Sequence, residues 1–312
     1  MRCEARKAAS RLVLGVPLPI TSHRSTIIRD EVREDDFAAL GPHGFHRVHY
    51  YEWGEPDNEK VLVCVHGLTR NGRDFDPLAR ALSTEYRVIC PDIVGRGKSG
   101  WLSYKEDYGY PLYCSDMAAL IARSGACTVD WVGTSMGGII GMLLAAHPDA
   151  PIRKLVVNDV GAFIPSSALD RLRTYVGKDP GFGSLEEAEA YLRRVSAPFG
   201  PLTDEQWRHL ASFSFSRRGD GQWGLVYDPA IADAFSGPPA DVDLWMFWDR
   251  IRCRALVLRG EQSDLLLAAT AREMTTRGPK AKFVEFAGIG HAPMLMDAKQ
   301  IAVVHEFLSN EA

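Results

Sequence analysis

The sequence lacks the features that mark several large classes of protein. Its six cysteines form no Cys-x-x-Cys pair, so the minimal spacing of a zinc or thiol–disulfide motif is missing. No apolar run reaches the roughly 18 residues that a membrane span needs. Neither sign of charge dominates, with 36 Lys and Arg against 40 Asp and Glu, so no basic stripe indicates nucleic acid. We therefore expect no metal, no membrane and no nucleic acid as partners of this 312-residue chain.

The N-terminal segment is also a poor secretory signal. Glu4 interrupts its charged region, two prolines break its apolar run, and no small-residue cleavage site follows. We expect residues 1–30 to be an Arg-bearing, disordered extension. Cys64 and Cys90 lie inside apolar runs, where cysteine behaves as a small hydrophobic residue. The cysteine pattern favours reduced thiols and a cytoplasmic location.

What is present is an alternation of short apolar runs with helix-length amphipathic segments. This rhythm is typical of βαβ units and predicts an α/β fold around a mostly parallel sheet. Continuous apolar runs such as VLVCV and ALVL indicate strands that are covered on both faces. The expected strands are His46–Trp53, Lys60–His66, Tyr86–Pro91, Thr128–Gly133, Lys154–Asp159, Ala255–Gly260 and Lys282–Phe286. The expected helices are Asp76–Ser83, Leu112–Arg123, Met136–Ala146 and Ala298–Leu308.

The alternation stops once, over residues 161–250. This stretch has no convincing buried strand, but it has helical patches such as Ser184–Val195, proline-rich joints and 14 of the 30 aromatic residues. We interpret it as a helical cap inserted into a core made of residues 31–160 and 251–312. The aromatic residues either pack the cap or line a pocket for a small apolar ligand.

The sharpest chemical motif is Gly133-Thr134-Ser135-Met136-Gly137, between an expected strand and an expected helix. Strand, sharp turn and helix are the context that a nucleophile elbow requires. The strained turn lifts the serine above the strand ends, and side chains two residues either side would collide, so both positions are glycine. Ser135 is thus the expected nucleophile.

A serine nucleophile needs a base and a group that orients the base. His291, in the glycine-rich loop GIGHAP after the last expected strand, is the expected base. Asp264, just past the strand ALVLRG, is the expected acid, and the order Ser135, Asp264, His291 is that of α/β-hydrolases. Asp159, at the end of the preceding strand, is the alternative acid, and Glu261 is a weaker third candidate.

Two backbone N–H groups are expected to stabilise an oxyanion. One belongs to Met136, which follows the nucleophile at a helix N-terminus. The other belongs to Leu68 in the loop His66-Gly67-Leu68, where His66 itself is expected to tie the loop by a hydrogen bond. Arg70 and Asn71, next to this loop, either touch substrate or cap the next helix.

Together these motifs make the chain resemble α/β-hydrolase-fold serine hydrolases, from about His46 to the C-terminus. The matching pieces are HG at His66, the loop Asp92–Ser99, the elbow GTSMGG, and the segments RGEQSD and GIGHAP. The resemblance implies an eight-stranded, mostly parallel sheet with helices on both faces, a helical cap after the sixth strand, and no cofactor.

The resemblance is specific for the fold and the triad, but not for the substrate. A serine at the elbow disfavours the dehalogenases and epoxide hydrolases of this fold, which use aspartate there. The charged cap disfavours a lipase that acts at an interface. The expected function is cleavage of a small carboxylic ester through an acyl-enzyme. A lactonase or a C–C bond hydrolase with the same triad, and a non-catalytic binding protein of this fold, are the alternatives.

Overall fold

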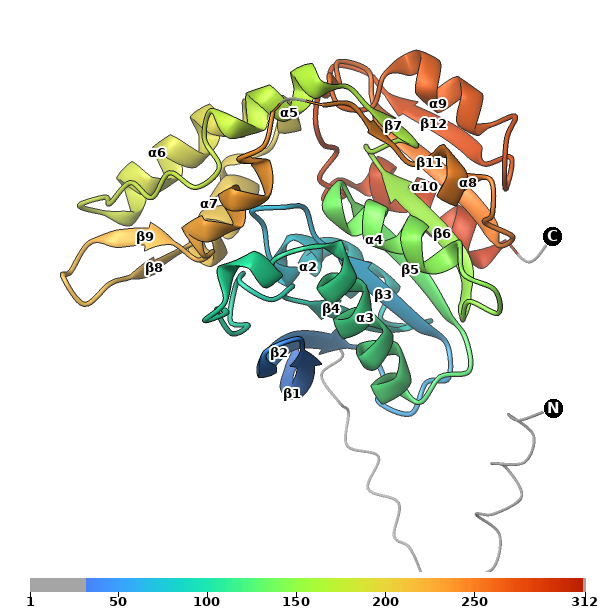
Figure 1. The fold of residues 1–312 in the computed structure, drawn as a ribbon, viewed down its shortest axis with the longest axis horizontal. Coiled ribbons are helices and arrows are strands. Elements are labelled where there is room, and N and C mark those ends of the chain that lie inside the picture. The colour runs from blue at the N-terminus through green and yellow to red at the C-terminus, as the bar shows by residue number, and fades with distance from the viewer. Residues whose placement is uncertain (1–31, 239, 311–312) are drawn as a thin grey trace, which may run out of the picture.

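A computed structural model describes residues 32–238 and 240–310, and the expected N-terminal extension lies outside these residues. The centre of the molecule is an eight-stranded sheet (Figure 1). The second strand of the chain pairs antiparallel with both the first and the fourth, and the other five strand pairs of this sheet are parallel. In spatial order the strands are β1 (Arg33–Gly41), β2 (Gly44–Trp53), β4 (Arg87–Pro91), β3 (Val61–Val65), β5 (Val129–Thr134), β6 (Ile152–Asn158), β11 (Arg254–Gly260) and β12 (Lys282–Phe286).

Seven of these strands coincide with the expected ones to within two residues. Five of them (β3, β4, β5, β6 and β11) are buried on both faces, whereas β2 is buried only over its second half and Phe286 is the one buried residue of β12. The eighth, β1, was not among the residue-by-residue expectations. Its sequence REDDFAALG is largely charged, and Ala39 is its one buried residue, as suits a strand at the edge of a sheet.

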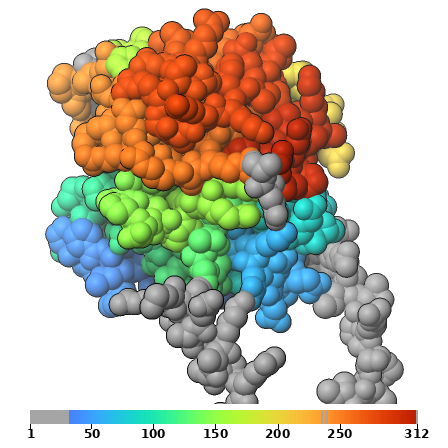
Figure 2. Space-filling view, turned by 90° about the vertical axis from the view of Figure 1, so that its right-hand side faces the viewer, coloured from blue at the N-terminus to red at the C-terminus, as the bar shows by residue number. Residues whose placement is uncertain are grey.

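Helices cover both faces of the sheet and enclose two apolar cores. One face packs against α3 (Tyr110–Ser124), α4 (Met136–Ala145) and α9 (Ala268–Met274), and the other against α2 (Asp76–Leu82) and α10 (Ala298–Ser309). In the space-filling view, orange and red C-terminal segments form the upper part of the visible face, green segments the middle and blue N-terminal segments the lower part (Figure 2). Shorter elements complete the core: η1 (Gly72–Phe75), η2 (Lys105–Asp107) and α8 (Trp245–Trp248).

Between β6 and β11 the chain leaves the sheet and forms the cap, whose helices and hairpin lie together to one side (Figure 1). The cap has an apolar cluster of its own, built on Leu192, Trp207 and Phe215, into which Met294 and Met296 of the core also pack. Ser184 caps its second helix by accepting the Glu187 N–H. Its elements are β7 (Phe163–Ile164), α5 (Ser166–Arg173), α6 (Leu185–Val195), η3 (Ala197–Phe199), α7 (Asp204–Ser214), β8 (Phe215–Arg217), β9 (Trp223–Leu225), η4 (Pro229–Phe235) and β10 (Val242–Asp243).

Two expectations from composition can be compared with the structure. Within the described residues, no helix is long and apolar enough to cross a membrane. Cys64, Cys90, Cys114 and Cys253 carry free thiols.

Candidate active site

The elbow after β5 has the geometry that its glycines predict. Ser135 has φ 51° and ψ −114°, a strained conformation for a residue with a side chain. A Cβ at Gly133 would overlap the carbonyl of Gly137, and one at Gly137 would overlap the carbonyl of Val65. Only glycine fits at either position, and the turn leaves the Ser135 hydroxyl partly exposed at the carboxyl edge of the sheet.

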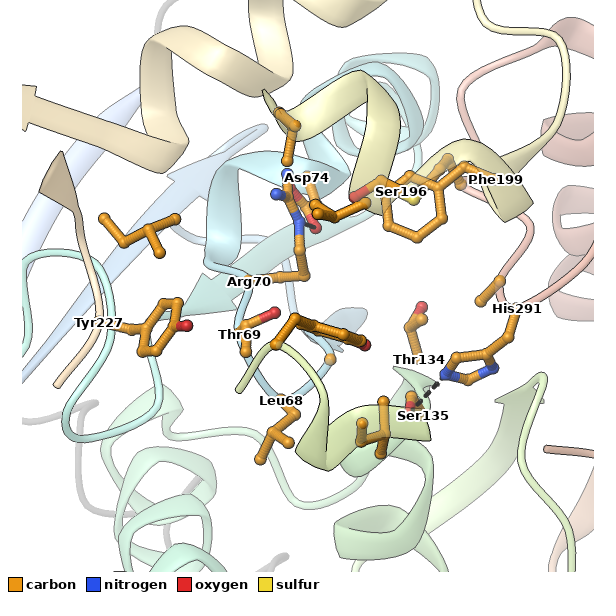
Figure 3. A pocket seen from close by; sticks show the side chains of 18 of the residues that line it. Leu68, Thr69, Arg70, Asp74, Thr134, Ser135, Ser196, Phe199, Tyr227 and His291 are labelled. Carbon is orange, nitrogen blue, oxygen red and sulfur yellow. Dashed lines mark hydrogen bonds and ion pairs between the residues drawn. The ribbon is translucent and has the colours of Figure 1, made fainter. Parts of the chain in front are cut away.

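A line of hydrogen bonds joins the hydroxyl to a histidine and an aspartate. His291 Nε2 lies 3.0 Å from Ser135 Oγ, and its Nδ1 lies 2.8 Å from Asp159 Oδ2. Figure 3 shows the imidazole pointing at the serine, with a dashed line between them. The Asp159 side chain is fully buried and its other oxygen accepts the Gly260 N–H at 2.8 Å, while the imidazole is 10% exposed. The arrangement holds one ring nitrogen against a buried carboxylate and leaves the other nitrogen for the hydroxyl.

The structure corrects the position of the acid. Asp264 does not lie against His291. It is exposed, and both its oxygens accept hydrogen bonds from Arg171 of α5, at 2.5 and 2.9 Å. The alternative, Asp159, occupies the place beside the histidine because β6 ends there and the backbone turns with φ 54°. Glu261 is not at the site either, since it accepts the Gly288 N–H.

Asn158 ties the three parts of this line together, a role that sequence reasoning missed. Its backbone carbonyl accepts the Ser135 N–H at 2.9 Å. Its buried side-chain amide donates to Thr134 Oγ1 at 3.0 Å and to the Pro293 carbonyl at 2.8 Å. One residue therefore connects the elbow, the histidine loop and the strand that ends in Asp159.

The loop after β3 lies beside the elbow, as expected for a pair of oxyanion donors. Within the described part of the chain, the Leu68 N–H has no hydrogen-bond partner, and the N–H of Met136 opens α4. The fully buried ring of His66 donates from Nδ1 to the Gly67 carbonyl at 2.7 Å and accepts the Ile93 N–H on Nε2 at 2.9 Å. Burial lowers the pKa of His66 to about 3, so the ring is neutral and its role is to tie the loop.

The loop Asp92–Ser99 contacts the two residues expected to donate to the oxyanion, Leu68 and Met136. Arg96 is fully buried, and its guanidinium donates to the Leu68 carbonyl at 2.9 Å and lies 3.7 Å from the sulfur of Met136. Asp92 accepts the N–H groups of Gly72 and Lys98, and burial raises its pKa to about 6. The motif therefore shapes the turn, as predicted, and Arg96 adds a contact to both expected oxyanion residues.

A cavity between cap and core opens on Ser135 and His291. Its lining is mainly apolar and aromatic, with leucines from α5, α6 and β9 and the rings of Tyr175, Tyr191, Phe199 and Tyr227. Figure 3 shows Arg70 beside Asp74 across the cavity from His291, and Tyr227 at its far end. Of the residues in doubt, Arg70 lines the cavity, whereas Asn71 accepts the Arg73 N–H as the cap of η1. Cap aromatics thus both pack and line the pocket.

No group of three or more metal-ligating side chains occurs among the described residues.

Comparison with known proteins defines the class. A family model described as "Alpha/beta hydrolase family" matches residues 62–304, so the chain belongs to the α/β-hydrolase family. A 3-hydroxybutyrate-oligomer hydrolase of Cupriavidus necator is 49% identical over 279 residues, covering 86% of this chain and 95% of that protein. The chain is accordingly a hydrolase that acts on esters.

Two solved structures share the fold. A hydrolase from Rickettsia typhi superposes with a TM-score of 0.84 at 32% identity, covering 90% of this chain and all of that one. An α/β-hydrolase from Novosphingobium aromaticivorans superposes with a TM-score of 0.79 at 35% identity, covering 88% and 98%. Both neighbours span cap and core together, so the expected fold class is confirmed.

Proposed function

We propose that Ser135, His291 and Asp159 form a catalytic triad that cleaves short oligomers of 3-hydroxybutyrate or closely similar hydroxyacid esters. The observation that carries this proposal is the unbroken line of hydrogen bonds from Asp159 through His291 to Ser135 at the mouth of the cavity. The substrate class is supported by the name of the Cupriavidus relative, whose length the chain covers almost fully.

In the first half of the reaction, Ser135 Oγ attacks the ester carbonyl while His291 Nε2 takes its proton. Asp159 holds the Nδ1–H and stabilises the imidazolium without taking the proton itself. The N–H groups of Leu68 and Met136 donate to the oxyanion of the tetrahedral intermediate. The imidazolium then protonates the departing alkoxide oxygen, which leaves a 3-hydroxyacyl ester on Ser135.

Water completes the cycle. His291 removes a proton from water as its oxygen attacks the acyl carbonyl, and the second tetrahedral intermediate collapses to free acid and serine. This step returns the proton to Ser135 Oγ, so the enzyme ends as it began. No cofactor takes part in any step of this proposal.

The cavity suits such a chain. Its leucines and aromatic rings can cover the methyl branches and methylenes, and the hydroxyls of Tyr175 and Tyr191 can donate to ester carbonyls, whereas that of Tyr227 donates to the Lys178 carbonyl. Because the cavity lies between cap and core, the bound chain is largely shielded from water other than the attacking one.

The test is hydrolysis of the linear 3-hydroxybutyrate dimer and of p-nitrophenyl butyrate, with Ser135→Ala as the paired variant. We expect release of monomer and of p-nitrophenol by the wild type and at least a 10⁴-fold loss in the variant, with an unchanged circular dichroism spectrum. Full activity of Ser135→Ala would refute the triad. Hydrolysis of p-nitrophenyl butyrate without cleavage of the dimer would keep the triad and refute the substrate.

A further inference from the structure

The cavity is lined by two arginines whose charges are balanced in different ways. Arg70 donates to both oxygens of Asp74, at 2.8 and 2.6 Å, and to Ser214 Oγ at 2.8 Å. Both members of this pair line the cavity, and each side chain is about 10% exposed. The pair shows the cavity no net charge, and most of the Arg70 donors are already used.

Arg171 differs from Arg70 in the position of its counter-charge and in the number of its donors that are in use. It comes from cap helix α5 and lines the cavity, but its partner Asp264 belongs to the core loop after β11 and is not among the described lining residues. The bond uses the Nε and one terminal nitrogen of the guanidinium, so the other terminal NH₂ group is not engaged by Asp264. Arg171 also hydrogen-bonds the side chain of Tyr175, which is neutral and lines the same cavity. The positive charge therefore belongs to the cavity wall, while its counter-charge lies outside that wall.

The pair is also of a kind that exchanges easily. The side chains of Arg171 and Asp264 are 32% and 48% exposed, and ion pairs in such surroundings contribute little because water and salt screen them. A carboxylate brought into the drier cavity can share or replace Asp264 on the guanidinium, whose planar fork matches a carboxylate in two hydrogen bonds.

We propose that Arg171 binds the free carboxylate of the substrate, so that the enzyme selects hydroxyacid oligomers as anions over neutral esters. This inference rests on the proposed function, because the dimer and longer oligomers carry that carboxylate on the alcohol side of the scissile ester. Arg171 is then a specificity residue, and Asp264 is the anion that occupies the guanidinium when no substrate does.

The experiment compares two substrates that differ only in charge: the 3-hydroxybutyrate dimer as the free acid and its methyl ester. The quantity measured is the ratio of kcat/KM for the acid to kcat/KM for the methyl ester. For Arg171→Met we expect this ratio to fall about ten- to a hundredfold, as for loss of a charge-assisted hydrogen bond. Arg171→Lys should fall less, because it keeps the charge but loses the fork.

Two further variants distinguish binding of the substrate carboxylate by Arg171 from an ion pair that only holds the cap to the core. Asp264→Asn removes the competing anion but keeps the size of the side chain, so the ratio should rise a fewfold. Arg173→Met removes the same charge from the same helix at a position outside the described cavity lining, so its ratio should equal that of the wild type. Melting temperatures measured alongside show which variants are folded.

A ratio in Arg171→Met within twofold of the wild type overturns the inference. So does an equal fall in Arg171→Met and Asp264→Asn, because that result means a clasp between cap and core and no carboxylate site. These outcomes are distinct from failure of the proposed function, in which the wild type cleaves neither the acid nor its methyl ester.

Discussion

Asp159 and Asp264 follow neighbouring parallel strands, yet their surroundings are opposite. The Asp159 side chain is fully buried and accepts hydrogen bonds from His291 and from the Gly260 backbone. The Asp264 side chain is about half exposed and pairs with one arginine of the cap. Topology brings both acids to the same edge of the sheet, so burial and backbone path, and not position along the chain, decide which one meets the histidine.

The same contrast holds for the two walls of the cavity. The core wall is fixed by buried hydrogen bonds, such as those of His66 and Asn158. The cap wall is also held to the core by buried contacts, such as the hydrogen bonds of Arg70 with Ser214 and of the Gly290 N–H with the Pro198 carbonyl, but its Arg171–Asp264 ion pair is partly exposed. We therefore expect this one ion pair, and not the cap wall as a whole, to exchange partners when substrate binds.

The largest expected effect separates the two acids directly. Asp159→Asn should lower kcat for p-nitrophenyl butyrate about 10⁴-fold, because the histidine loses the partner that fixes its tautomer. Asp264→Asn should lower it less than tenfold. Steady-state kinetics on both purified variants measure the difference, and the reverse order would return the acid role to Asp264.

A smaller effect is expected from the buried His66, on the pH dependence of the unfolding free energy. The folded-state pKa of His66 is about 3, below the ordinary value near 6.5, so its contribution to stability is complete above about pH 6.5 and is lost as the pH falls toward 3. Between pH 7 and pH 5 this group should cost the wild type about 2 kcal/mol of unfolding free energy. His66→Gln cannot titrate, so urea denaturation should show it less stable at pH 7 but with a pH dependence flatter by that amount. Parallel curves for the two proteins would contradict the burial argument.

The smallest effect is expected from the partly exposed ion pair of Asp264 with Arg171, on the unfolding free energy. Asp264→Asn should change the unfolding free energy by no more than about 1 kcal/mol, and this difference should shrink in 1 M NaCl. Urea denaturation at low and high salt provides the measurement. A loss above about 2 kcal/mol that salt does not reduce would show the Arg171 pair to be part of the fold's framework.

Much of this molecule can be predicted from sequence, for identifiable reasons. The central strands β3, β4, β5, β6 and β11 can be predicted because burial on both faces leaves continuous apolar runs. Ser135 is readable because its turn admits only glycine at two fixed positions. The edge strand β1 is not, since one buried alanine leaves no periodic pattern.

Asp264 was expected beside His291, with Asp159 as the alternative, and that order of preference was wrong for a different reason. Two carboxylates follow adjacent strands, and choosing between them requires the path of the chain after Asn158, which no local pattern encodes. The contacts of Asn158 and Arg96 join segments that are far apart in sequence, so a single chain gives no signal for them. The one local signal for Asp159 was Asn158, because two polar residues in a row end the apolar run LVV of that strand.

The position of the cap has a consequence for how such enzymes diversify. The chain leaves the sheet at the end of β6 and returns in β11, which pairs directly with β6 in register from Lys154 with Arg254 to Asn158 with Leu258. The two ends of the cap are thus anchored on adjacent strands, and a segment of different length or sequence can be spliced between them without altering a hydrogen bond of the sheet. Because Asp159 stands at the first joint, a graft that begins beyond it would keep the three residues of the proposed triad and exchange the cap side of the pocket.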